Sequence, residues 1–171
     1  VLVIINAITD SNASRPMDRI LLAKAIDRSP KSSVFHSLLS SSQQYGLTVG
    51  KKSSETIEPT DLGLNITKPL NPEERQEALL KAFMTPEPFQ RVLDFYNQEA
   101  LPESELFQNA LDRKFDVDPE RTEEFEHIFR ENAFFVGVIE EVSGDDYIML
   151  DRDVTERESS QGEEEEKDRK S

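Results

Sequence analysis

Residues 32–46 read SSVFHSLLSSSQQYG, and this stretch decides the fold of the first half of the chain. In a helix that turns by about 100 degrees per residue, one side collects Phe35, Leu38, Leu39, Ser42 and Tyr45. The opposite side is polar and consists of Ser33, Ser37, Ser40 and Gln44, with His36 and Ser41 at its edges. Serine is a mediocre helix former, so a side built from serine indicates a contact surface.

The ends of this helix are marked by residues that start and stop helices. Pro30 and the serines around it favour a start, with Ser29 or Ser32 as the N-cap that accepts a free backbone N–H. Gly46 favours a stop, because glycine readily takes the left-handed conformation that closes a helix.

The neighbouring segments complete a small helical domain. Residues 1–9, VLVIINAIT, are either the end of a helix or a buried strand, and residues 17–26, MDRILLAKAI, have helical spacing. After Gly46, the β-prone segments 47–50 and 56–60 enclose the polar stretch KKSSE. This pattern predicts a hairpin with Lys51 and Lys52 at its turn.

The order of helix, helix, serine-bearing helix and lysine-tipped hairpin resembles the winged helix-turn-helix superfamily. The resemblance covers residues 1–67 and rests on the spacing of LLAKAI and FHSLL and on TDLG after the second hairpin strand. It implies that residues 32–45 form the helix that such domains place against a DNA groove, and that residues 50–55 form the wing.

The second half of the chain has a similar pattern, with amphipathic helices followed by a hairpin. Four amphipathic helices are predicted in residues 71–135, and the third is expected to bury Leu106, Phe107, Ala110, Leu111 and Phe115. VGVIEEV and YIML around SGDD predict a second hairpin. When the sequence is shifted by 90 residues, Phe35, Leu38, Leu39, Ser42 and Tyr45 of the serine-bearing helix align with Phe125, Ile128, Phe129, Asn132 and Phe135. This alignment indicates either two copies of one unit or the spacing that any two amphipathic helices share.

We therefore expect a mainly α fold with small β-hairpins (α+β), a winged helix-turn-helix in one or two copies joined by a helical segment. The expected domains are residues 1–70, a helical connector at 71–99, a second winged-helix-like unit at 100–151 and a disordered acidic tail at 152–171.

Charge separates the two halves. The whole chain has a net charge of -15, but residues 1–70 carry eight Lys and Arg against six Asp and Glu, whereas residues 71–150 carry seven against twenty. The first half is suited to a polyanion and the second opposes one. The absence of cysteine from the sequence favours a cytoplasmic protein. No apolar run in it is long enough for a membrane span. The start at Val1 suggests that the sequence is part of a longer chain.

The residue types and their spacing in the sequence give little indication of a catalytic site. His36 and His127, the two histidines, each lie beside an apolar stripe, and the sequence contains no phosphate-binding glycine loop and no Gly-x-Ser-x-Gly elbow. Glu123, His127 and Glu131 have helical spacing that leaves a metal site open, although a solvated helix face explains them more simply. We expect no enzyme, no cofactor and no metal.

Binding of double-stranded DNA is the leading hypothesis for the first half. The expected contacts are Lys31, Ser33, His36, Ser37, Ser40, Gln44, Lys51 and Lys52, with the lysines on phosphates. Arg19, Lys24 and Arg28 add further positive charge. Only Gln44 is a strong base reader, so low sequence specificity is expected.

A protein partner is the competing hypothesis, because small serine side chains also allow close approach of another protein. SPKSSVFHSLLSSSQQYGLTVG and ENAFFVGVIEEV also resemble the winged-helix regions that precede effector domains in some bacterial proteins. That resemblance implies an adaptor or sensor that regulates an effector domain of a larger chain.

Overall fold

The computed structural model describes residues 1–150, so the predicted tail at 152–171 lies outside the described residues. The described chain is mainly helical with small antiparallel β-hairpins, which confirms the expected α+β class. The described residues form two compact units, which divide between Gln90 and Arg91. The expected helical connector at 71–99 is therefore divided between these two units.

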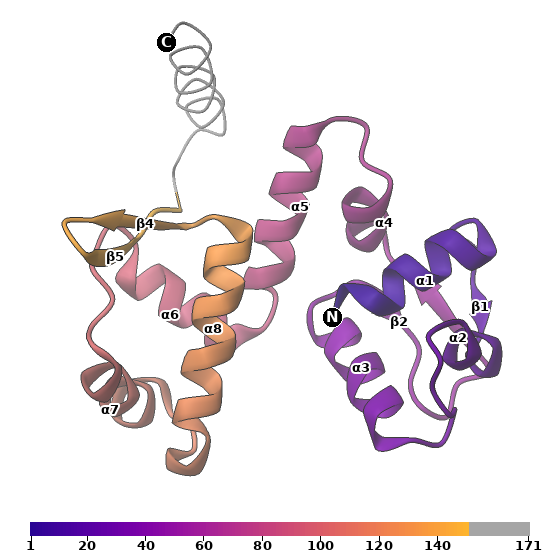
Figure 1. Cartoon of the computed structure of the whole chain (residues 1–171), viewed down its shortest axis with the longest axis horizontal. Coiled ribbons are helices and arrows are strands. Elements are labelled where there is room, and N and C mark those ends of the chain that lie inside the picture. Colours follow the sequence, from indigo (N-terminus) through magenta and orange to yellow (C-terminus); the bar gives the residue numbers. More distant parts are fainter. Residues whose placement is uncertain (151–171) are drawn as a thin grey trace, which may run out of the picture. The chain divides into compact units, whose positions relative to one another are not determined.

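The first unit combines helices with a three-stranded antiparallel sheet (Figure 1). Its helices are α1 (Leu2–Asn12), α2 (Arg19–Ala25), α3 (Ser33–Gln44), α4 (Asp61–Thr67) and α5 (Pro72–Met84). Its strands are β1 (Met17–Asp18), β2 (Thr48–Val49) and β3 (Thr56–Pro59), in the order β1-β3-β2. Met17 is opposite Ile57 and Thr48 is opposite Pro59, so β3 is the central strand.

The core of the first unit shows why these segments fold as they do. Residues 1–9 form a helix rather than a strand, because Ile4, Ile5 and Ile8 recur at helical spacing and are all fully buried. The main hydrophobic cluster joins α1, α2 and α3 to the sheet and contains Ile4, Ile8, Met17, Leu22, Ala23, Phe35, Leu39 and Ile57.

The predicted helix over residues 17–26 is wrong at its start. Met17 and Asp18 form β1, and the Asp18 side chain then caps α2 by accepting hydrogen bonds from the backbone N–H groups of Ile20 and Leu21. With Asp18 as its N-cap, the helix begins at Arg19, two residues later than predicted, so Met17 remains extended and pairs with β3.

Helix α4 was not expected from the sequence. Thr60 caps it by accepting a hydrogen bond from the Gly63 N–H, while the Thr60 hydroxyl contacts the carbonyl oxygens of Gly46 and Leu47. Gly63 is buried in this short helix and lies against Leu47 and Ile5. The missing side chain therefore lets α4 approach the backbone that follows α3.

We expect Gly63→Ala to destabilise the first unit, although this change usually favours a helix by about 1 kcal/mol. A Cβ at this position would overlap the Leu47 carbonyl oxygen, which is backbone and has no room to move, and would lie 2.9 Å from Ile5 Cδ1. The cost should be about 1–3 kcal/mol, measured by urea unfolding. Asn65→Ala in the same helix is the matched control, and a stabilising effect of Gly63→Ala would contradict the close approach.

The second unit has a similar order of elements. The end of α6 (Glu87–Tyr96) is followed by α7 (Ser104–Phe115), the short 3-10 helix η1 (Pro119–Arg121) and α8 (Thr122–Val136). The hairpin of β4 (Ile139–Val142) and β5 (Asp145–Ile148) then closes the unit. The segment 97–101 lies along β5, because Leu101 N donates to Asp146 O at 2.7 Å and Ile148 N donates to Glu99 O at 3.1 Å. As in the first unit, the hairpin strand that comes last in sequence is central.

The correspondence between the units differs in detail from the predicted offset of 90. Gly46 and Gly137 each follow the last long helix in the left-handed conformation, with φ of 73° and 77°, and Ile57 and Ile148 are each fully buried in the last strand. Both pairs are 91 residues apart. Phe135 is therefore not a core residue and is 59% exposed. Leu106, predicted to be buried, is 62% exposed, because the core side of α7 is formed by Phe107, Leu111 and Phe115.

Candidate nucleic-acid interface

Helix α3 presents an exposed polar face, which we call the serine face: Ser33, Ser37, Ser40 and Gln44. Beneath it, Phe35 is completely buried and Leu39 is 1% exposed. Burial of two large apolar side chains fixes the rotation of the helix, since any other rotation would expose them to water. The four residues of the serine face are therefore held toward the solvent.

Two serines next to this face, Ser32 and Ser42, have structural roles. Ser32 is the N-cap predicted as one of two alternatives, and its Oγ accepts a hydrogen bond from Phe35 N at 3.2 Å. Ser42 is completely buried and accepts a hydrogen bond of 2.8 Å from the Thr48 hydroxyl. This bond ties the end of α3 to β2, where the hairpin begins.

The lysines of the first hairpin are at its tip, in residues 51–54. Lys51 N donates to Ser54 Oγ at 2.9 Å and Ser54 N donates to Lys51 O at 2.9 Å, which closes a tight turn. The side chains of Lys51 and Lys52 are exposed. Lys31, just before α3, is also exposed.

Arg19 joins the hairpin to the turn that precedes α3. Its Nε donates to Ser54 O at 3.1 Å and its Nη1 donates to Pro30 O at 3.1 Å. The backbone N–H of Arg19 also donates to Glu55 O at 2.9 Å. The sequence predicts only a positive charge for Arg19, whereas in the structure its guanidinium also positions the hairpin. No residue pattern indicates this role, because its partners are backbone carbonyl groups.

His36 is set apart from the rest of the predicted interface. Its Nε2 lies 3.1 Å from the Pro30 carbonyl oxygen, and its side chain is partly buried beside Phe35. This nitrogen is committed to the backbone as a donor. The structure therefore brings Ser33, Ser37, Ser40 and Gln44 onto one exposed face and places His36 at its edge.

Positive charge is concentrated in the part of the first unit that carries α3 and the hairpin. Residues 1–90 contain ten Lys and Arg and ten Asp and Glu, but residues 19–52 contain six basic residues and one acidic residue, Asp27. Glu55, just before β3, and Glu58, within β3, are both exposed. The basic character is thus confined to α2, the start of α3 and the hairpin tip.

The second unit contains a buried charged network. Glu126 is 6% exposed and accepts hydrogen bonds from the Ser104 hydroxyl at 2.7 Å, from Gln108 Nε2 at 2.9 Å and from Arg130 Nε at 2.9 Å. Burial raises the pKa of Glu126, but these three hydrogen bonds and the charge of Arg130 outweigh that effect and hold the pKa below its ordinary value. Every polar atom of the carboxylate is engaged within the fold, which indicates a structural role.

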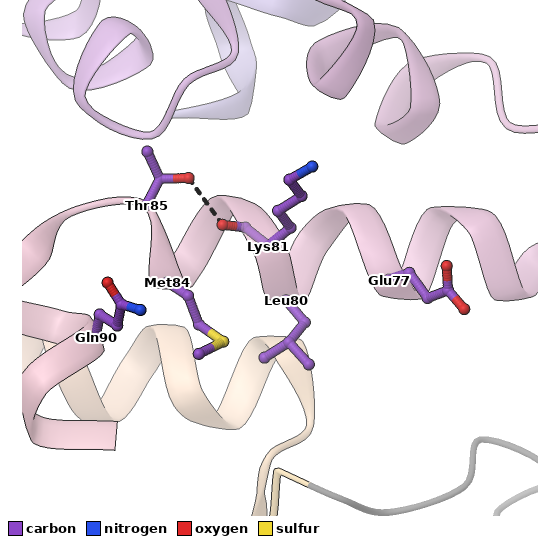
Figure 2. A pocket seen from close by; sticks show the side chains of 6 residues that line it. All are labelled: Glu77, Leu80, Lys81, Met84, Thr85 and Gln90. Carbon is purple, nitrogen blue, oxygen red and sulfur yellow. Dashed lines mark hydrogen bonds between the residues drawn. The ribbon is translucent and has the colours of Figure 1, made fainter. Parts of the chain in front are cut away.

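A shallow, open hollow of about 430 Å³ lies along α5 and the start of α6. Figure 2 shows Leu80 and Met84 on one side of α5 and Lys81 and Thr85 on the other, with the Thr85 hydroxyl donating to Lys81 O at 2.8 Å. The remaining residues that line it are Glu77 and Gln90. The lining thus combines apolar side chains with the charged side chains of Glu77 and Lys81.

The metal option that the spacing of Glu123, His127 and Glu131 leaves open has no counterpart in residues 1–150, where no group of three or more His, Asp or Glu side chains is placed to hold a metal ion. His127 Nε2 lies 3.5 Å from a carboxylate oxygen of Glu131, and both side chains are mostly exposed. This geometry is that of a solvent-exposed contact between neighbouring turns of a helix.

Comparisons with protein-family models, curated proteins and solved structures found no match to this chain. None of the helices in residues 1–150 has the length and apolar character needed to span a membrane.

Proposed function

We propose that the first unit is a non-catalytic winged-helix module that contacts double-stranded DNA with low sequence specificity. The observation that carries the proposal is the serine face of α3, which stands exposed over Phe35 and Leu39 beside a lysine-tipped hairpin. Arg19 supports it further, because it fixes the hairpin against the turn that leads into α3. A helix and a hairpin held together in this way can contact a groove and the flanking phosphates at once.

The order of elements supports the winged-helix assignment. A helix, a short strand, two helices and a hairpin follow one another, and the strand order is β1-β3-β2. This arrangement agrees with the resemblance drawn from the sequence. In such a domain α3 is the helix that enters the groove and residues 50–55 form the wing.

Low sequence specificity follows from the chemistry of the serine face. It contains no Arg or Lys to pair with guanine and no Asn to pair with adenine, which leaves Gln44 as the one bidentate base reader. Serine hydroxyls bind phosphates and base edges of several kinds. Affinity would therefore come mainly from Lys31, Lys51 and Lys52 on the phosphate backbone.

A protein-protein adaptor is the second candidate function. The observation that favours it is Val34, which is 51% exposed at the start of α3, next to Ser33. An apolar side chain among small serines suits a protein surface better than a phosphate backbone. In this alternative the serine face packs against a partner or an effector domain of a longer chain.

Titration of a fluorescent DNA duplex, followed by anisotropy at several salt concentrations, tests the proposal. Three lysine contacts predict a slope of about -3 in a plot of log affinity against log salt, since each released counterion contributes about -0.9. The double variant Lys51→Gln, Lys52→Gln should flatten the slope by close to two units.

The matched control is Lys68→Gln, Lys81→Gln, which removes the same charge from exposed positions outside α3 and the hairpin. This variant should keep the wild-type slope. No binding at low salt, or equal losses in the two variants, would favour the adaptor.

A further inference from the structure

The outward side of α8 in the second unit combines aromatic and acidic residues. The helix buries Thr122, Glu126, Phe129, Ala133 and Val136 on its inner side. Its outer side, which we call the α8 face, carries Glu124, His127, Ile128, Glu131, Phe134 and Phe135. All of these are exposed except Ile128, which is partly exposed.

Phe134 and Phe135 are the most unusual residues on this face, because they are 77% and 59% exposed. Among residues 1–150 neither ring has an aromatic or cationic partner. By contrast, Phe95, which is 48% exposed, has the Lys114 ammonium 3.9 Å from its ring centre and packs edge-on against Phe115. Two adjacent unpartnered phenyl rings form an apolar surface typical of a protein interaction site.

The charge around these rings selects the kind of partner. Glu124 and Glu131 lie on the same face, with side chains that are 59% and 68% exposed. Glu124 pairs at 3.1 Å with Arg121, and Glu131 lies 3.5 Å from His127 Nε2, but most of each side chain is open to solvent. Residues 91–150 carry sixteen Asp and Glu against five Lys and Arg. Such a field attracts a basic segment, repels nucleic acid and opposes the approach of the same face of a second copy.

We propose that the α8 face binds a basic amphipathic helix of a partner protein. Apolar side chains of that helix would pack on Phe134, Phe135 and Ile128, while its Lys and Arg side chains would pair with Glu124 and Glu131. The spacing of three and four residues along α8, from Glu124 to Ile128, Glu131 and Phe135, matches the ridge that another helix packs against. The proposal does not depend on DNA binding by the first unit.

Helices α3 and α8 each precede the hairpin of their unit, but their exposed faces have different side chains. The serine face of α3 contains no aromatic residue, and the face of α8 contains two. A wet polar contact with a duplex needs no aromatic anchors, whereas a protein contact depends on a few buried ones. The aromatic pair on the α8 face is thus a feature of a protein contact, whatever the first unit binds.

A displayed library of random peptides of about 15 residues, or roughly four helical turns, tests the proposal. The full 171-residue chain is the bait, and the double variant Phe134→Ser, Phe135→Ser is used for counter-selection. Enriched peptides should be basic and should carry apolar residues at helical spacing. The affinity of these peptides for the chain, measured by anisotropy, should fall at least tenfold in Phe134→Ala. It should also fall as the salt concentration rises, and the double variant Glu124→Gln, Glu131→Gln should make this salt dependence weaker.

Leu70→Ser is the matched control, because Leu70 is 88% exposed and lies outside α8. It should leave peptide affinity unchanged, and thermal unfolding should show that each variant folds. No enrichment over the counter-selection, or enrichment of neutral or acidic peptides, would overturn the proposal. Dimerisation that disappears in Phe134→Ala, seen by light scattering, would overturn it as well, because the occupant would then be a second copy.

Discussion

Phe35→Ala should lower the free energy of unfolding of the first unit by about 3–5 kcal/mol, the usual cost of emptying a fully buried phenylalanine site. Phe35 is 0% exposed and belongs to the cluster that joins α1, α2 and α3 to the sheet. A domain of this size is typically stable by about 5–15 kcal/mol. The variant should therefore be marginally folded and should lose the proposed DNA binding together with its structure.

The control for Phe35→Ala is Ser37→Ala, two residues along the same helix on the exposed side. It should change stability by no more than about 0.5 kcal/mol. Phe35→Leu keeps most of the buried volume and should cost roughly 1.5 kcal/mol. Urea unfolding followed by circular dichroism measures all three variants. Equal effects of Phe35→Ala and Ser37→Ala would show that α3 is rotated differently from the structure.

Arg130→Met should be the most damaging single change among the charged residues of the second unit. Its guanidinium donates to Glu126 at 2.9 Å and to Pro102 O at 2.8 Å, approaches Asp146 at 3.4 Å and lies over the Phe107 ring. Its removal leaves the Glu126 carboxylate buried without its cation. The expected loss is about 3 kcal/mol, at the low end for a broken buried pair because Arg130 is 27% exposed.

The pH dependence of this loss gives a second readout. The pKa of Glu126 is below its ordinary value of 4.5, so its ionised form stabilises the fold above that pH, and the contribution disappears as the pH falls through the lowered pKa. The difference between wild type and Arg130→Met should therefore be largest near neutral pH and should shrink below about pH 4. The double variant Glu126→Met, Arg130→Met should be less destabilised than Arg130→Met at neutral pH. An effect of Arg130→Met that does not vary with pH would contradict the network.

The sequence was most informative where long periodic segments met clear caps. The sequence predicts the helix from Ser33 to Gln44 with Ser29 or Ser32 as its cap, and the structure has Ser32. It also predicts the stop at Gly46 and the direction of the serine face, because Phe35 and Leu39 set the period. The two hairpins were also predicted, since each has a polar turn between β-prone runs.

The elements that were missed are short and depend on tertiary contacts. Strand β1 has two residues, and it forms because Met17 pairs with Ile57, far away in sequence. Helix α4 forms where Gly63 allows close approach to Leu47. The hydrogen bonds of Arg19 and the exposure of Leu106 are not predictable for a related reason, since backbone partners and the exact rotation of a helix are set by the assembled fold.

Nuclear magnetic resonance with a DNA duplex tests the central claim most directly, because the amide signals report which surface of the full chain contacts the DNA. The account predicts that the signals perturbed at low salt come from α3 and the hairpin tip, above all Ser33, Ser37, Gln44, Lys51 and Lys52, while those of α8 are unchanged. Perturbations centred on α8, or none at duplex concentrations that saturate the anisotropy signal, would contradict it.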